Sequence, residues 1–298
     1  GVLPAMESDP DAQLRTVLRA AGIHHQHLAD HEKALEYYQR VLETLDPGNA
    51  VAVDATEAIY RETAQWDELI DVLHSKLTAD MTADQEKALR FEIGAVWRDQ
   101  LQEPEAAMAI YREMMDKFPD DVRIYDELAA LHMRASAWSE LSDVLQRKLS
   151  ALSNRPDAST GDLADLHVKL GMLAYSQGGD AGLAVEHYID AISADGANDL
   201  AVQSLLELLA SPDHQHTIAL ALEPVFEQRG MYPELADVLE IQLGAAKKKS
   251  IGKLLKRLVD LYDENLQDTE RALWAASRLF EQDAKVKAVR TRLEGFVE

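Results

Sequence analysis

A chain of 298 residues without cysteine can form no disulfide, thiolate metal site or cysteine nucleophile. Its net charge of −23 argues against nucleic acid and anionic membrane surfaces as partners. It also has no apolar run of about 18 residues, so direct membrane insertion is not expected. The charge is uneven, since residues 1–243 carry −26 and residues 244–298 carry +3. Solubility or a basic partner explains the acidic body.

Helical spacing of apolar residues recurs along the chain and predicts an all-α fold of about 16 antiparallel helices. Local signals mark several helix ends. The turn Asp46-Pro47-Gly48-Asn49 ends one helix, a capping box of Thr82 and Gln85 opens another, and Pro104 suits a first helical position. The expected helices cover approximately residues 14–28, 32–45, 50–63, 66–77, 86–101, 104–118, 122–134, 138–149, 163–177, 181–192, 199–210, 218–230, 232–243, 251–266, 269–283 and 286–297.

One helical sequence occurs three times, as WDELIDVLHSKL at 66–77, WSELSDVLQRKL at 138–149 and YPELADVLEIQL at 232–243. We call it the signature helix. The first interval, 72 residues, is close to two helical hairpins of about 34 residues with short linkers. The second interval, 94 residues, leaves room for one extra helix.

These intervals predict a single repeat domain over residues 1–298. Its last unit has no signature helix, so we expect the array to be cut within a longer protein. The chain has no signal-peptide pattern, which slightly favours the cytoplasm, but it begins Gly-Val-Leu rather than with Met, as a trimmed chain would. A trimmed N-terminus would leave the cell envelope or secretion open. The expected units are approximately 11–81, 82–159, 160–247 with one extra helix, and a truncated 248–298.

A second pattern joins the first two helices of each unit. A glycine in the first helix precedes an alanine and a tyrosine, four residues apart, in the second. Small residues let two helices approach closely, and the aromatic ring fills the seam between them. With Trp97, Pro119 and Leu170 these positions resemble the tetratricopeptide repeat. The positions are Gly22, Gly94 and Gly171, then Ala34, Ala107, Ala184 and Ala272, then Tyr38, Tyr111 and Tyr188.

The resemblance covers roughly residues 12–285 and implies a right-handed α-α superhelix, a tetratricopeptide-like solenoid. The stretch from LLELLASPDH to YPELADVLEIQL is further similar to large repeat proteins of myxobacteria and their relatives. In the tetratricopeptide family the first helix of each hairpin lines a concave groove that binds peptides. Counted from the glycines, the residues expected to line it are Arg19, Ile23, Gln26, Phe91, Ala95, Arg98, Val168, Met172 and Tyr175.

Two charged clusters and one aromatic position have both structural and functional interpretations. His24, His25, His27 and His31 have metal-ligand potential but are interpreted as a polar helix face, so no metal site is predicted. One basic run consists of Lys247–Lys249 with Lys253, Lys256 and Arg257. It is expected to complement the dipole at the end of the 232–243 helix and to face an acidic neighbouring repeat, or else to dock an acidic peptide or another subunit. The aromatic residue that opens each signature helix is expected to plug a seam rather than anchor a partner.

No nucleophile elbow, phosphate loop or metalloprotease helix is present, so we expect no enzyme, no catalytic residue and no cofactor. The main hypothesis is a non-enzymatic scaffold that binds a partner protein or peptide in the concave groove. The first alternative is a structural self-assembly element of a larger bacterial multidomain protein, which would form homo-oligomers. The second alternative is a metal-binding or enzymatic protein that uses the histidine cluster.

Overall fold

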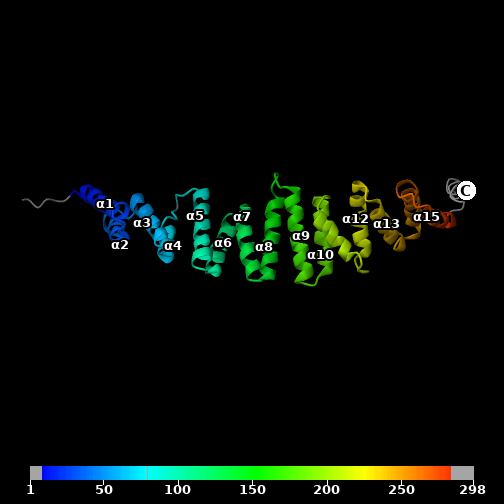
Figure 1. Ribbon diagram of the computed structural model, residues 1–298, viewed down its shortest axis with the longest axis horizontal. Helices are drawn as coiled ribbons and strands as arrows, with labels where there is room; N and C mark the ends of the chain where they lie inside the picture. The colour runs from blue at the N-terminus through cyan, green and yellow to red at the C-terminus, as the bar shows by residue number, and fades with distance from the viewer. Residues whose placement is uncertain (1–8, 79, 283–298) are drawn as a thin grey trace, which may run out of the picture. The chain divides into compact units, whose positions relative to one another are not determined.

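The computed structural model describes residues 9–78 and 80–282, and it forms two compact units, Gly1–Leu131 and His132–Glu298. The described residues contain fifteen α-helices, each packed mainly on the helices next to it in the chain (Figure 1). The predicted all-α class of consecutive antiparallel helices is therefore confirmed. The predicted helix at 286–297 lies outside the described residues.

Unit 1 holds the first six helices and most of α7. Consecutive helices pair through short turns, α1 with α2, α3 with α4 and α5 with α6. Two helices end in a π-helical turn, named η1 after α2 and η2 after α5. The bounds are α1 Pro10–Gln26, α2 His31–Arg40, η1 Val41–Leu45, α3 Ala50–Glu62, α4 Trp66–Ser75, α5 Ala83–Ala95, η2 Val96–Gln100, α6 Pro104–Lys117 and α7 Val122–Arg134.

Unit 2 holds the remaining helices, with the same pairing of α9 with α10, α12 with α13 and α14 with α15. One helix, α11, lies between two hairpins and packs on both α10 and α12. The bounds are α8 Trp138–Ser153, α9 Thr160–Ser176, α10 Ala181–Ala194, α11 Asp199–Leu208, α12 Gln215–Arg229, α13 Tyr232–Gly244, α14 Lys248–Asp260, η3 Leu261–Asn265 and α15 Thr269–Gln282.

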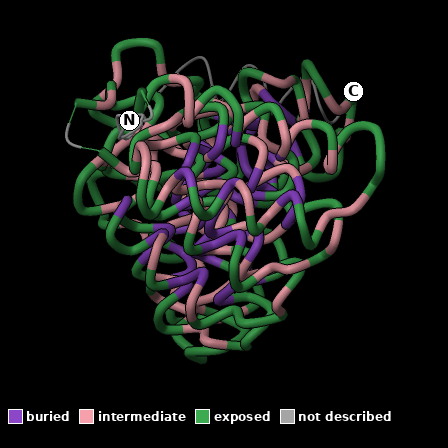
Figure 2. The backbone as a smooth tube through the Cα atoms, turned by 90° about the vertical axis from the view of Figure 1, so that its left-hand side faces the viewer, coloured by how far each residue is buried: buried purple, intermediate pink, exposed green. Residues whose placement is uncertain are grey.

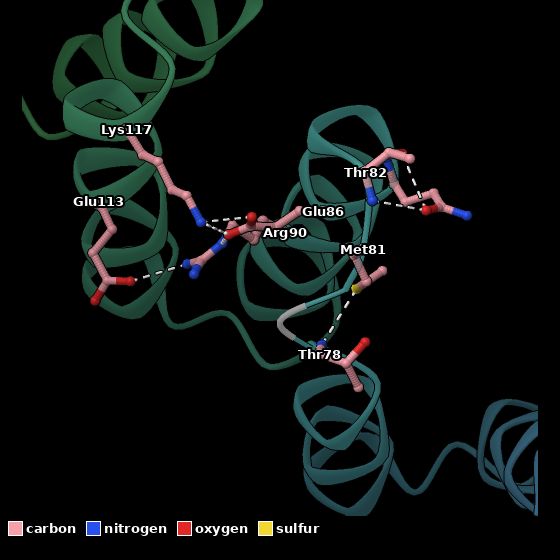
Figure 3. Close-up of polar contacts among 8 residues, drawn as sticks. Thr78, Met81, Thr82, Glu86, Arg90, Glu113 and Lys117 are labelled. Atoms are coloured by element: carbon pink, nitrogen blue, oxygen red, sulfur yellow. Dashed lines mark hydrogen bonds and ion pairs between the residues drawn. The ribbon is translucent and has the colours of Figure 1, made fainter. Parts of the chain in front are cut away.

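Several helices begin at a polar side chain that accepts a hydrogen bond from an otherwise unpaired first-turn amide. The predicted capping box is confirmed, because the Thr82 hydroxyl accepts from the Gln85 amide and the Gln85 side chain accepts from the Thr82 amide (Figure 3). To the left of Thr82 in Figure 3, Glu86 on α5 accepts hydrogen bonds from Arg90 on the same helix and from Lys117 on α6. The bond from Lys117 connects the two helices of this hairpin. The other capping side chains include Asp9, Asp30, Asn49, Ser159, Asp180 and Asn198.

Every turn inside a hairpin contains one residue in the left-handed conformation, with φ between 49° and 67°. The turns are of two kinds. In the first kind, the amide after the left-handed residue donates to a carbonyl six residues back, as Asp30 does to His24 at 2.9 Å. In the second kind it donates five residues back, as Gln65 does to Tyr60 at 2.9 Å, which is the Schellman pattern. The left-handed residues are Ala29, Ala64, Gln102, Ser136, Gly179, Gly230 and Gln267.

The two kinds of turn follow the sequence repeat. Each signature helix, α4, α8 or α13, follows a turn of the second kind, whose hydrogen bond spans five residues. The aromatic residue of the signature is the first residue of the helix. The hairpins that carry the Gly, Ala and Tyr pattern have the six-residue turn. Each repeat of the sequence thus contains two hairpins that differ in the structure of their turns.

The predicted close approach is present at Gly94 and Gly171 but not at Gly22, where a Cβ atom would lie 4.0 Å from the Tyr38 hydroxyl. A Cβ atom on Gly94 would lie 2.5 Å from Cζ of Tyr111, and one on Gly171 would lie 2.7 Å from Cε1 of Tyr188. Both tyrosines are buried, and burial raises the pKa of Tyr111 to about 12. Figure 2 shows buried and exposed stretches alternating along the helices, as expected where each helix buries one face.

Candidate functional site

Ion pairs connect the first helices of successive hairpins within each unit. In unit 1, Arg61 on α3 pairs with Glu92 on α5, and Arg98 at the end of the α5 segment pairs with Glu127 on α7. In unit 2, Arg257 on α14 pairs with Glu223 on α12. The resemblance predicts that these helices line the groove. Ion pairs between successive groove helices therefore already occupy part of that predicted surface.

The residues predicted to line the groove fall into three environments. Arg19, Ile23 and Gln26 are exposed on α1, and Met172 and Tyr175 are neighbours on α9, each more than half exposed. Phe91 and Ala95 on α5 and Arg98 in η2 are half-buried. Val168 is buried, since it lies only about 60° around α9 from Gly171, which faces the neighbouring helix.

Two of these half-buried residues, Phe91 and Arg98, already contact other side chains of unit 1. The Phe91 ring packs 5.9 Å from the Tyr111 ring, and the Arg123 guanidinium lies 5.0 Å from the Phe91 centroid. Arg98 also bonds Asp99 at 2.7 Å, and this hydrogen bond is the main reason its pKa is raised. The α1 and α5 residues do not meet, because the hairpin of α3 and α4 separates them along unit 1.

A concave site in unit 2 lies among α12, α13 and α14. It is a cavity of about 400 Å³ with cationic and apolar lining. Leu220 on α12 is half exposed and shares the wall with Leu254 on α14. The polar lining residues are His216, Glu223, Gln242, Lys247, Ser250, Lys253 and Arg257. We call this site the cationic pocket.

The basic run is placed differently from the sequence-based expectation. The helix of the third signature copy, α13, ends at Gly244, and Lys248 and Lys249 belong to the first turn of α14. The expectation that these cations complement the dipole of the 232–243 helix is therefore wrong. They stand at a helix N-terminus that has neither a capping side chain nor an acidic residue in its first turn, where positive charge is disfavoured.

One carboxylate organises the floor of the cationic pocket. Burial alone would raise the pKa of Glu223, but hydrogen bonds from Arg257 and Gln242 lower it, so this side chain stays ionised. Gln242 is itself buried and donates to Glu223 at 2.7 Å and to the Ala219 carbonyl at 3.1 Å. Arg257 is thus neutralised by Glu223, and it also reaches Glu227 at 3.3 Å.

The two lysines of the cationic pocket remain available. Among the residues that the structure describes, neither Lys247 nor Lys253 has an ion-pair partner within 4 Å. The sequence shows the basic run but does not predict this site, because His216, Glu223 and Gln242 are brought to the lysines by packing of α12 and α13 on α14.

Histidines come together in two places. His167 on α9 and His187 on α10 place their Nδ1 atoms 3.3 Å apart, beside Asp190. Burial lowers the pKa of both imidazoles, and the two rings hydrogen-bond each other in their neutral forms. In unit 1, His25 and His31 approach Glu62. Glu62 follows His31 by 31 residues, so the sequence alone does not predict that it lies beside the histidines.

The aromatic residues that open the signature helices are mostly covered. Trp66 and Trp138 are half-buried, and Trp66 packs against the buried cluster of α3, α4 and α5. Tyr232 is somewhat more exposed, at 37%. Within residues 9–78 and 80–282, none of the helices has the length and hydrophobicity that a membrane crossing needs.

No family model matches this chain, and no curated protein matches it. Solved helical-repeat structures are similar to it. The C-terminal part of a TPR repeat-containing protein from Cytophaga hutchinsonii is 16% identical over 92% of this chain and 98% of that one, with a TM-score of 0.39. YrrB, described as a TPR protein with an unusual peptide-binding site, is 19% identical over 63% and 89%, with a TM-score of 0.34. MamA is 21% identical over 65% and 96%, with a TM-score of 0.34. Likenesses this low carry nothing about a partner or a site.

Proposed function

We propose that this chain is a non-enzymatic protein-interaction scaffold, and that its cationic pocket binds an acidic segment of a partner protein. The observation that carries the proposal is a cavity of about 400 Å³ that combines unpaired lysines with exposed leucine surface. Peptide sites commonly combine apolar contact with a few placed charges. The resemblance to myxobacterial repeat proteins stays a prediction and adds no partner.

The charges favour an acidic ligand over other kinds. Lys247 directly precedes α14, at an uncapped N-terminus whose first amides also attract negative charge, and Lys253 lies in the second turn of the same helix. A carboxylate bound there would relieve the unfavourable cations of the first turn. Leu220 and Leu254 would contact an apolar side chain of the same segment. An amphipathic acidic peptide satisfies both parts of the site.

The test is fluorescence anisotropy with a labelled peptide of alternating Glu and Leu, and with its Lys and Leu counterpart as the charge control. The double variant K247E/K253E should weaken binding of the acidic peptide at least about tenfold, since two attractive contacts become repulsive. The matched control is K256E, which makes the same charge change on an exposed α14 residue outside the cationic pocket. Equal losses in both variants would mean that general charge, and not the pocket, governs binding.

Self-assembly remains the second candidate because the chain is acidic over residues 1–243 and basic over residues 244–298. One molecule's acidic surface could then occupy another molecule's cationic pocket. Light scattering over a concentration series separates the two functions. A monomer at all concentrations argues against self-assembly, whereas a dimer that K247E/K253E disrupts would identify a second copy as the ligand.

A further inference from the structure

The ends of three helices in unit 1 bring two histidines and a carboxylate together. His25 lies in the last turn of α1, His31 is the first residue of α2, and Glu62 is the last residue of α3. Nε2 of His25 is 3.6 Å from Oε2 of Glu62, and Nδ1 of His31 is 3.9 Å from the same oxygen. All three candidate ligand atoms lie within 4.8 Å of one another.

This spacing is close to that of a zinc site. Bonds of about 2.0–2.1 Å in a tetrahedral arrangement place ligand atoms about 3.3 Å apart, so modest side-chain rotations would close the cluster on an ion. Two imidazoles and one carboxylate are a ligand set that divalent transition metals favour. The cluster is also reachable from solvent, since the Glu62 side chain is 56% exposed while that of His25 is only 14% exposed.

A second observation concerns the same cluster. Nδ1 of His31 is buried and has no hydrogen-bond partner, and buried polar atoms of that kind cost free energy unless something binds them. Its distance of 3.9 Å from Oε2 of Glu62 is too long for a hydrogen bond. Nδ1 of His24 is also buried without a hydrogen-bond partner, but it lies 3.3 Å from a carboxylate oxygen of Asp30. The other histidine pair differs in this respect, because Nδ1 of His167 and Nδ1 of His187 satisfy each other at 3.3 Å.

We propose that His25, His31 and Glu62 bind a divalent transition-metal ion, with Zn²⁺ the best match, and that water completes its coordination. The ion would join the ends of α1, α2 and α3, which belong to two successive hairpins. Because the unfolded chain lacks this arrangement, binding would stabilise the folded unit. This site is independent of the cationic pocket, which lies in the other unit.

The experiment is calorimetric titration of the full chain with Zn²⁺, after chelation and buffer exchange, together with thermal unfolding with and without Zn²⁺. We expect saturable binding of one ion and a rise in Tm. The variants H25Q, H31Q and E62Q should each weaken Zn²⁺ binding at least about tenfold, since even loss of an outer-shell partner can cost that much. The controls are H24Q, adjacent to the site but directed at Asp30, and H187Q in the other histidine pair.

Circular dichroism without metal establishes that each variant folds, and E62Q preserves a fair test if a histidine variant does not, because Glu62 is largely exposed. Absence of saturable binding in the wild-type chain would overturn the proposal. So would unchanged affinity in H25Q, H31Q and E62Q. A loss confined to H187Q would place the ion at the His167–His187 pair and would also contradict the proposed site.

Discussion

Gly94 and Gly171 let their helices pack directly against a buried tyrosine of the next helix. A Cβ atom at either position would lie within 2.7 Å of a ring carbon of Tyr111 or Tyr188, closer than such contacts are tolerated. Gly22 holds the matching place in the first hairpin, but its Cβ would lie 4.0 Å from the Tyr38 hydroxyl, an ordinary contact distance. The same sequence pattern therefore occurs with a very close helix contact at Gly94 and Gly171 and with an ordinary contact at Gly22.

We expect G94A and G171A each to lower the free energy of unfolding by about 1–3 kcal/mol, because the buried ring or the helix must move. The matched variant G22A should be neutral or should stabilise by up to about 1 kcal/mol, since alanine is the better helix former and has room here. Urea unfolding followed by circular dichroism measures all three. Equal destabilisation by all three would show that the clash distance is not the cause.

At the residue scale the sequence predicts contacts inside a hairpin better than contacts between hairpins. The contacts of Gly94 with Tyr111 and of Gly171 with Tyr188 follow from the spacing, because each glycine and its tyrosine face each other across one hairpin. The predicted groove position Val168 is buried, since it lies close to Gly171 around α9 and shares the side that packs on the neighbouring helix. Arg98 is half-buried and forms an ion pair with Glu127. The sequence does not predict this pair, because Glu127 lies 29 residues away on another helix. The approach of Glu62 to His25 and His31 depends on packing in the same way.

The turns set the geometry of the elements. Five of the seven left-handed turn residues are not glycine, although the left-handed conformation costs other residues free energy. Gly230 and Ala64 occupy equivalent places, each before a signature helix and each closed by a hydrogen bond spanning five residues. The same turn therefore has glycine, the favourable residue, at position 230 and alanine at position 64.

The substitutions G230A and A64G should have unequal effects on the free energy of unfolding. G230A should lower the free energy of unfolding by about 1 kcal/mol, because alanine must adopt a positive φ. A64G should lower it less or should raise it, since relief of that conformation offsets the greater chain entropy of glycine. G244A is the control, because Gly244 has no positive φ and no neighbour within 4 Å of a Cβ. Thermal unfolding of the three variants measures these differences, and similar losses in G230A and G244A would contradict the explanation.

Helix starts were predictable where a side chain supplies the signal, as at Thr82, Pro104 and the aromatic that opens each signature helix. The start of α14 was not, because the sequence predicts it near residue 251 and it lies at Lys248. The sequence from Gly244 to Lys249 has no proline and no strong cap, so nothing local separates the last turn of one helix from the first turn of the next. The π-helical ends were also missed, since they arise from turn geometry rather than from residue type.

For the whole molecule, the dominant electrostatic feature is the excess of negative charge, −23 in all and −26 within residues 1–243. Many carboxylates are paired at short range, as Glu86 is with Lys117 at 2.6 Å. The remaining carboxylates repel one another over longer distances. Salt screens such long-range repulsion between exposed groups much more than it weakens close, half-buried pairs.

The stability of the chain should therefore rise with salt. Between about 20 mM and about 200 mM NaCl the Debye length falls from roughly 20 Å to less than 10 Å, which removes most repulsion between distant carboxylates. We expect the urea midpoint of unfolding to increase over this range, measured by circular dichroism at constant pH. Chloride is the appropriate anion, because sulfate would strengthen apolar burial at every protein surface. A falling midpoint would mean instead that the ion pairs joining successive helices contribute more to stability than the net charge costs.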